Sequence, residues 1–209
     1  MLPAAPLITE ANLIFDELCE SICQCGWAMQ DNFLSIDLAD ELLKTSKRLF
    51  ADRQFHPAGI GSGTIDSRQR TDHTLWIDLH NCQPSQQQLC RILDELKCYL
   101  NRQLFLGLEA NEIHAVTYPP GAFYKRHWDN RKNSNRRILT WILYLNPQWQ
   151  ASDGGQLRIY LDEDSHLDIA PLHNRLVCFL SDHFEHEVLK TLKTRNSLTG
   201  WFGKTLMVP

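Results

Sequence analysis

The sequence has no long hydrophobic run. No segment approaches the ~20 consecutive apolar residues that a membrane-spanning helix needs, and the first residues lack the charged region and apolar core of a secretory signal. Repeats and low-complexity tracts are absent as well. The absence of these features argues against a membrane or exported protein, so we expect a globular protein of the cytoplasm.

The chain also has little net charge. Its 21 Lys and Arg side chains against 25 Asp and Glu give a formal charge of −4, which argues against a general nucleic-acid binder. One basic concentration occurs, at Arg131, Lys132, Arg136 and Arg137, and Asn and Ser interrupt it. Such a run is typical of a solvated loop. We therefore expect no nucleic-acid partner.

A disulfide framework is not indicated either. The chain has 7 cysteines, an odd number without regular spacing, and secreted disulfide scaffolds usually pair an even set. The cluster at Cys19, Cys23 and Cys25 is not followed by the paired Cys or His residues of a zinc site. We interpret the cysteines as free thiols in a reducing compartment.

At 209 residues the chain is long enough for one sizeable core. We predict a loose N-terminus over residues 1–11 and a single domain over residues 12–209. From Ile113 onward, short apolar or aromatic runs recur between turn sequences, a pattern typical of a sandwich of antiparallel strands. The predicted class is α+β, mainly β.

Three helices are expected before these strands. Apolar side chains recur at helical spacing over residues 12–23, 36–50 and 86–104. Ser35 and Ser85 are the expected N-caps of the second and third helices, because a Ser hydroxyl accepts a hydrogen bond from a free backbone N–H of the first turn. Such helices usually back a sheet.

The pattern His-x-Asp occurs twice. On a strand, residues i and i+2 share a face, so His127 and Asp129 could reach one metal together. The second copy, His166 and Asp168, lies in the polar run 162–168, which reads as an exposed turn. We interpret the second copy as a solvated loop. Two histidines and one carboxylate on one face of an octahedron are typical of non-haem Fe(II) oxygenases.

A third ligand is expected downstream of the first copy. The apolar run 176–180 predicts a buried strand, and the polar turn after it leads to a short strand with His186. His183 is the rival third ligand. Arg195 lies nine residues after His186, whereas Leu192 lies nine residues after His183. The planar guanidinium of arginine is suited to holding a dicarboxylic acid, which favours His186.

These residues lie within a longer set of motifs that resembles the 2-oxoglutarate-dependent prolyl 4-hydroxylases of the hypoxia-inducible-factor type. The match is in the family's order from Tyr118 to Phe202, and its core covers residues 113–203. Tyr118 lies nine residues before His127, whereas ten are expected in the animal enzymes. The matching segments are Tyr118–Gly121, Tyr124–Asn130, Leu143–Asn146, Gly154–Arg158, Asp168–Pro171, Phe179–Asp182, His186–Val188, Thr194–Arg195 and Thr199–Trp201.

The resemblance implies a fold and a set of cofactors. The fold is a double-stranded β-helix, or jelly-roll, backed by the N-terminal helices. His127, Asp129 and His186 would bind Fe(II), and Arg195 with the Tyr144 hydroxyl would hold the 5-carboxylate of 2-oxoglutarate. O2 is the second cosubstrate, and ascorbate is the expected reductant. The other residues expected to line the cosubstrate pocket are Tyr118, Ile142, Leu157, Val188 and Thr199.

The resemblance also implies a substrate. Tyr124, Arg137 and Trp201 would lie beside a prolyl residue hydroxylated at C4, and Asp72 and Trp76 would anchor a loop. That loop is the Gly/Ser-rich segment 58–70, whose composition is typical of a lid or of a disordered segment.

The short form of the chain looks like the bacterial branch of the family. An elongation factor Tu-like translation factor is therefore a plausible substrate, and O2 consumption would allow oxygen sensing. We expect a monomer. Two alternatives stay open: the same cofactor chemistry on a free amino acid or another side chain, and a metal-binding oxygen sensor without turnover.

Overall fold

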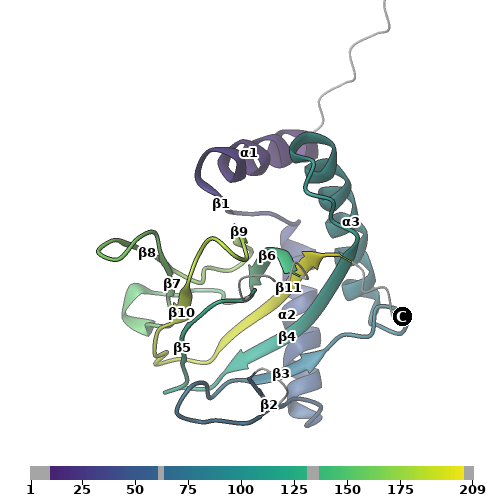
Figure 1. Ribbon diagram of the computed structural model, residues 1–209. Helices are drawn as coiled ribbons and strands as arrows, with labels where there is room; N and C mark the ends of the chain where they lie inside the picture. Colours follow the sequence, from purple (N-terminus) through teal and green to yellow (C-terminus); the bar gives the residue numbers. More distant parts are fainter. Residues whose placement is uncertain (1–9, 61–63, 131–136, 205–209) are drawn as a thin grey trace, which may run out of the picture.

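The computed structural model describes residues 10–60, 64–130 and 137–204. Three helices lie in the first half of the chain, and most strands follow them (Figure 1). In chain order the elements are α1 (Glu10–Cys25), β1 (Trp27–Gln30), α2 (Ile36–Ala51), β2 (His56–Pro57), β3 (His73–Trp76), α3 (Pro84–Leu104), β4 (Ala110–Tyr118), β5 (Tyr124–His127), β6 (Arg137–Tyr144), the 3-10 helix η1 (Ala151–Asp153), β7 (Leu157–Tyr160), β8 (His166–Ile169), β9 (Leu176–Leu180), β10 (His186–Val188) and β11 (Arg195–Gly203).

Two antiparallel sheets form the body of the protein. The larger has seven strands in the order β1-β9-β6-β11-β4-β3-β2, and the smaller has four in the order β5-β10-β7-β8. Strands that are distant in sequence are neighbours in both sheets: β11 pairs with β4 on one side and β6 on the other. The structure confirms the predicted mainly-β class with N-terminal helices.

The central strands of the larger sheet are buried on both faces, and their sequence reflects this. On β6, Leu139, Trp141 and Leu143 belong to the same apolar core as the helices, whereas Ile142 and Tyr144 belong to a second core on the other face. Because side chains alternate along a strand, a strand covered on both faces reads as a continuous apolar run.

The helices cover the outer face of the larger sheet (Figure 1). On α3 the four leucines at helical spacing are at most 1% exposed, and burial of one such side chain is worth about 1.5–3 kcal/mol. They are Leu89, Leu93, Leu96 and Leu100. The helix layer thus fixes the sheet from behind and leaves its other face for a site.

Helix caps were predicted with mixed success. Ser35 is the N-cap of α2, where its side chain accepts a hydrogen bond from the Leu38 N–H at 3.4 Å, as predicted. The prediction of Ser85 as the cap of α3 is wrong. Gln83 is the N-cap, because Pro84 has a fixed φ suited to the first helical position, where its missing N–H would have no partner within the helix.

The second His-x-Asp copy is also placed differently from the prediction. His166 and Asp168 lie on the strand β8 and not in a turn, although both are exposed as expected. The tight turn precedes them, where Asp162 accepts hydrogen bonds from the Asp164 and Ser165 N–H groups. A short polar strand at a sheet edge has the same composition as a turn, so local pattern did not separate the two.

All 7 cysteines are free thiols, as expected. Among the described residues no helix is long and apolar enough to cross a membrane. The predicted loose terminus, residues 1–11, lies mostly outside the described residues, and so do three members of the basic run: Arg131, Lys132 and Arg136.

Candidate active site

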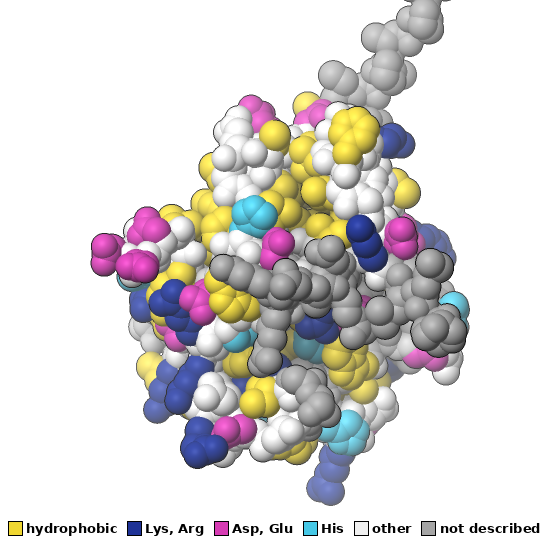
Figure 2. All heavy atoms as spheres, viewed as in Figure 1, with side chains coloured by type: hydrophobic (Ala, Val, Ile, Leu, Met, Phe, Trp, Pro, Cys, Tyr) yellow, Lys and Arg dark blue, Asp and Glu magenta, His cyan; other side chains and the backbone are white. Residues whose placement is uncertain are grey.

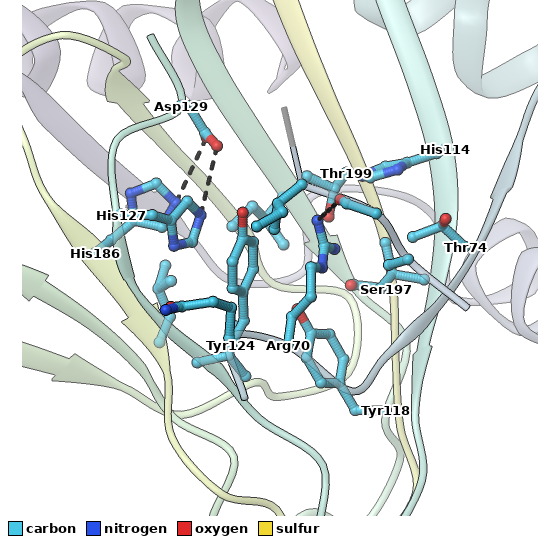
Figure 3. A pocket seen from close by; sticks show the side chains of 18 of the residues that line it. Arg70, Thr74, His114, Tyr118, Tyr124, His127, Asp129, His186, Ser197 and Thr199 are labelled. Atoms are coloured by element: carbon cyan, nitrogen blue, oxygen red, sulfur yellow. Dashed lines mark hydrogen bonds and ion pairs between the residues drawn. The ribbon is translucent and has the colours of Figure 1, made fainter. Parts of the chain in front are cut away.

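The two sheets enclose a cavity of about 980 Å³. One wall is the inner face of the seven-stranded sheet, and the other is formed largely by β5, β7 and β10 of the smaller sheet (Figure 3). Because alternate residues of a strand share a face, the lining residues of β3, β4 and β11 occupy every second position. The lining residues of the larger sheet are Glu112, His114, Val116 and Tyr118 on β4, Arg195, Ser197, Thr199 and Trp201 on β11, Arg137 and Ile142 on β6, and Thr74 and Trp76 on β3.

His127, Asp129 and His186 meet at one side of this cavity (Figure 3). His127 ends β5 and His186 begins β10, and the antiparallel register places them opposite each other. One Asp129 oxygen lies 3.7 Å from His127 Nε2 and the other lies 3.5 Å from His186 Nε2. One ligand atom from each residue lies within 4.8 Å of the others.

Backbone contacts orient both rings. His127 Nδ1 lies 2.7 Å from the Lys125 carbonyl, and His186 Nδ1 lies 3.4 Å from the Phe184 carbonyl. When Nδ1 carries the proton and donates to a carbonyl, the lone pair of Nε2 is left for a metal, which is the usual arrangement of metal-binding histidines. Both Nε2 atoms face the Asp129 carboxylate.

Asp129 is held from behind by a buried hydroxyl. Thr140 Oγ1 donates to one Asp129 oxygen at 2.8 Å and lies 2.9 Å from the Ser181 hydroxyl. Thr140 and Ser181 are both fully buried. This contact fixes the carboxylate at the end of β5, where no regular strand pairing would do so.

The electrostatics of the group suit a metal. Burial lowers the pKa of His186 to about 4, so its imidazole is neutral at pH 7. Burial alone would raise the pKa of Asp129, but the neighbouring His186 and His127 outweigh it and hold that pKa well below the ordinary range. Two imidazoles and one carboxylate are the donor set of non-haem Fe(II) sites, so these residues fit Fe(II).

The competing ligands lie elsewhere. His183 is exposed and contacts Asp182 at 2.8 Å. Asp168 of the second copy receives two hydrogen bonds from Arg158, at 2.7 and 2.8 Å. The structure therefore groups His186 with the first copy, as predicted.

Arg195 lies at another end of the cavity. It is 1% exposed, and its Nε donates to the Gly155 carbonyl at 2.9 Å. Gly154 and Gly155 both have positive φ, 71° and 66°, which glycine adopts without strain. A Cβ on Gly155 would lie 3.2 Å from Arg195 Cδ. The Gly-Gly turn thus brings a carbonyl close to the buried arginine.

Two tyrosines flank the Arg195 guanidinium. Its carbon lies 4.9 Å from the ring centres of both Tyr118 and Tyr144. Tyr144 Oη is buried and has no hydrogen-bond partner within the described residues. Burial raises the pKa of Tyr144 to about 12 and raises that of Tyr118 further. Both hydroxyls keep their protons and are available as donors.

The predicted pocket residues are mostly brought together. Tyr118, Ile142, Leu157, Val188 and Thr199 line the cavity. Tyr144 is not one of its lining residues and reaches the site through its contact with Arg195. Tyr144 does not line the cavity because its side chain is fully buried at the end of β6.

Four of the predicted substrate residues make ring contacts around the cavity. Tyr124 stacks on His127 with ring centres 3.6 Å apart and planes 17° apart. Arg137 lies 3.5 Å above the Trp201 ring, and Trp76 lies 6.1 Å from that ring. These residues also line the cavity.

Asp72 is paired with Arg70, a site residue that the sequence analysis did not predict. It is 1% exposed and accepts two hydrogen bonds from Arg70, at 2.8 and 2.6 Å. Arg70 also donates to the Gly59 carbonyl at 3.2 Å and lies 4.0 Å above the Tyr124 ring. Of the predicted lid, residues 58–70, positions 61–63 lie outside the described residues.

His114 and Ser197 were missed as well. The signal was available in strand alternation: Ser197 is two residues from Arg195, and His114 is four from Tyr118, so both face the cavity. Only a weak indication in the sequence pointed to Arg70 as part of the site, namely its position two residues before Asp72.

Comparison with known proteins gives consistent matches. Residues 113–203 match the 2OG-Fe(II) oxygenase superfamily. The chain is 33% identical over 190 residues to the prolyl hydroxylase EGLN3 of Homo sapiens, covering 86% of this chain and 79% of that protein. It is 28% identical over 210 residues to the hypoxia-inducible factor prolyl hydroxylase of Caenorhabditis elegans, but spans only 29% of that protein.

Two solved structures are similar over almost the whole chain. A prolyl-4-hydroxylase of Pseudomonas putida is 38% identical with a TM-score of 0.85, covering 92% of this chain and 100% of that one. A Trichoplax adhaerens prolyl hydroxylase, in complex with a hypoxia inducible factor peptide fragment, is 27% identical with a TM-score of 0.87, covering 93% and 90%. These likenesses confirm the predicted double-stranded β-helix core.

Proposed function

Because the chain belongs to the 2OG-Fe(II) oxygenases and is an enzyme of the prolyl hydroxylase type, we propose that it hydroxylates C4 of a prolyl residue within a protein substrate. The observation that carries the proposal is one cavity that holds both a two-histidine, one-carboxylate group and a buried arginine. The first suits a metal and the second suits the far carboxylate of a dicarboxylic acid.

His127, Asp129 and His186 would hold Fe(II). When bound, Fe(II) with 2-oxoglutarate and O2 supplies the chemistry that inserts one oxygen atom into a C–H bond, while the cosubstrate becomes succinate and CO2. Three protein ligands on one face leave the opposite positions for exchangeable groups. The Lys125 and Phe184 carbonyls and the Thr140 hydroxyl keep the three side chains in place for this task.

Arg195 would bind the 5-carboxylate of 2-oxoglutarate. Its Nε–H is already directed to Gly155, which fixes the plane of the guanidinium. The Tyr144 hydroxyl supports this role because it is a buried donor without a partner among the described residues and lies beside Arg195. Tyr118, Ile142, Leu157, Val188 and Thr199 would exclude water from the chain of the cosubstrate.

The target proline would lie near Tyr124 and Trp201. Tyr124 stacks on His127 and both rings line the cavity, and aromatic faces are suitable walls for an apolar ring. Arg137 would hold the Trp201 ring in place by its contact with the ring face. Asp72 and Trp76 would anchor the loop 58–70 over the substrate. The peptide bound to the Trichoplax adhaerens relative supports a protein substrate.

An elongation factor Tu-like translation factor is the protein substrate that we propose to test first. The likeness to a bacterial prolyl-4-hydroxylase over 92% of the chain supports the choice of a bacterial protein. Ascorbate as reductant, action in the cytoplasm as a monomer, and a turnover that reports oxygen are parts of the same proposal.

The test is mass spectrometry of purified elongation factor Tu and of fractionated bacterial proteins after incubation with enzyme, Fe(II), 2-oxoglutarate and ascorbate. We expect one added oxygen atom on a proline, located by fragmentation, and 4-hydroxyproline in the hydrolysate. Asp129→Ala is the inactive control. Succinate release that no protein stimulates, with oxidation of a free amino acid, would overturn the proposal.

A further inference from the structure

His114 is a buried histidine of the cavity wall that the metal site does not use. It lies on β4, opposite Thr199 of β11 and Trp76 of β3 in the strand registers. It shares the inner face with Val116 and Tyr118. In Figure 3 it lies across the cavity from His127, Asp129 and His186. It therefore lies in the part of the cavity that the proposed protein substrate would enter.

Two indole rings hold the imidazole. The Trp76 and Trp201 ring centres lie 4.9 and 5.0 Å from that of His114, and the residue is 6% exposed. No hydrogen bond to its ring nitrogens is found among the described residues. Neither nitrogen is among the fully buried atoms of the described residues that lack a partner, so the imidazole is open to the cavity, where a bound group would satisfy its hydrogen-bonding capacity.

The ring is neutral at ordinary pH. Burial first, and then the positive charges of Arg70 and Arg137, lower the pKa of His114 to about 3. A neutral imidazole offers one N–H donor and one nitrogen acceptor. It would match a backbone amide, and it would gain no ion pair from a carboxylate.

The cations on this side of the cavity are already paired. Arg70 is bound by Asp72 at 2.6 Å, and Arg137 by Glu112 at 3.0 Å. Arg126 donates to Glu185 at 2.6 Å. Among the described lining residues, the arginine left for a carboxylate is Arg195, which the proposed cosubstrate would occupy. A free amino acid would find no cation here for its own carboxylate.

We infer that His114 is a specificity-determining residue that accepts a hydrogen bond from the peptide N–H following the target proline. The inference rests on the proposed function and names the group by which the site would recognise a peptidyl proline. The prolyl nitrogen carries no hydrogen in a chain, so the nearest backbone donor on the C-terminal side is the next N–H. Free proline lacks this amide, and a carboxylate stands in its place.

The test crosses enzyme variants with modified peptides. The probe is a synthetic peptide around the proline identified by mass spectrometry, made with a normal amide and with an N-methyl group on the following residue. Loss of a buried hydrogen bond costs about 1–3 kcal/mol, so N-methylation should raise the wild-type KM about tenfold. His114→Phe should raise the KM for the normal peptide by a similar factor and abolish the effect of N-methylation.

The conservative variants provide rescue. His114→Asn and His114→Gln place an amide oxygen near the positions of Nδ1 and Nε2, so one of them should recover part of the lost affinity for the normal peptide only. The KM for 2-oxoglutarate, Mn(II) affinity and melting temperature should stay near wild type. His166→Phe, a change on the exposed strand β8, is the matched control and should leave every value unchanged.

Each outcome decides one question. Equal KM effects of N-methylation in wild type and His114→Phe would overturn the role of His114 and leave prolyl hydroxylation standing. A wild-type enzyme that hydroxylates no peptidyl proline would overturn both. Should His114→Phe fail to fold, His114→Asn and His114→Gln are compared on the same two peptides, and an undiminished N-methylation effect in both would likewise overturn the inference.

Discussion

The two His-x-Asp copies have the same spacing and both lie on or beside antiparallel strands, yet only the first lies in a metal-ligand group. His127 and Asp129 lie between the sheets, with one ligand atom of each within 4.8 Å of one from His186. His166 and Asp168 lie on β8, at the edge of the four-stranded sheet, and both are exposed.

The difference shows that the surroundings determine whether the pattern binds a metal. At the second copy, strand alternation brings both side chains toward one face, whereas Asp129 of the first copy lies in a bend just after β5. At the first copy a third ligand from β10, two carbonyls and a buried hydroxyl complete the site. At the second copy the carboxylate is taken by Arg158, so an exposed ion pair forms instead.

The strongest way to test this comparison is to remove a carboxylate from each copy. Asp129→Ala should lower 2-oxoglutarate turnover by more than about a hundredfold, because loss of a ligand should exceed the 10- to 100-fold effect typical of its outer partners. His127→Ala and His186→Ala should behave alike. Turnover is measured as succinate release with Fe(II) and protein substrate.

The controls are His166→Ala and Asp168→Ala, which should retain near wild-type turnover. A second readout avoids dependence on activity: Mn(II) should raise the melting temperature of wild type and of both controls but not of Asp129→Ala, since a ligand that binds only the folded state stabilises it. Equal damage at the two copies would mean that the metal group has been wrongly assigned.

A smaller effect is expected from the arginines associated with the two regions. Arg195→Lys should raise the KM for 2-oxoglutarate by about tenfold or more, because lysine keeps the charge but loses the planar two-point contact. Arg158→Lys makes the same chemical change beside Asp168 and should leave that KM unchanged. An unaltered 2-oxoglutarate titration for Arg195→Lys would argue against its place at the 5-carboxylate.

The hydroxyl behind Asp129 sharpens the comparison further. Thr140→Val preserves shape but removes the donor that lies 2.8 Å from the carboxylate, so Mn(II) affinity should fall about tenfold, as for other outer partners of metal ligands. Calorimetric titration with Mn(II) measures this directly.

The matched control is Thr117→Val. Thr117 is also buried and donates to the Asn196 side chain at 3.1 Å, away from the metal group. This variant should lower the melting temperature and leave the metal dissociation constant unchanged. If Thr140→Val binds Mn(II) as tightly as wild type, the hydroxyl does not position Asp129.

Local signals predicted the elements whose patterns are long or chemically specific. The leucine spacing of α3 and the Ser35 cap of α2 are examples, since each depends on residues within one helix. Ser85 was misassigned because serine is a favoured N-cap residue and Gln is not, whereas Pro84 begins the helix by its fixed φ and leaves Gln83 as the N-cap. The core residues of the site came from spacing combined with the family resemblance.

Contacts between distant strands were beyond the sequence. His114 belongs to the site because β4 pairs with β3 and β11, and Arg70 belongs to it because it forms an isolated bridge with Tyr124. Those registers join segments that are far apart in the chain, and no local periodicity encodes which strands become neighbours. The same limit explains β8: its polar run is a strand only because β7 lies beside it.

The smallest expected effect concerns the stability that the second copy contributes. The hydrogen bond from Arg158 lowers the pKa of Asp168, with burial opposing it. A carboxyl with a lowered folded-state pKa stabilises the fold above its unfolded pKa of about 4 and loses that contribution as pH falls through the folded value. Because the pair is partly exposed, Asp168→Asn should cost at most about 1 kcal/mol at pH 7. Urea unfolding should show this difference shrinking below pH ~4, with Mn(II) affinity at pH 7 unchanged. A deficit that persists in acid, or a loss of metal affinity, would mean that Asp168 does more than close an ion pair on an edge strand.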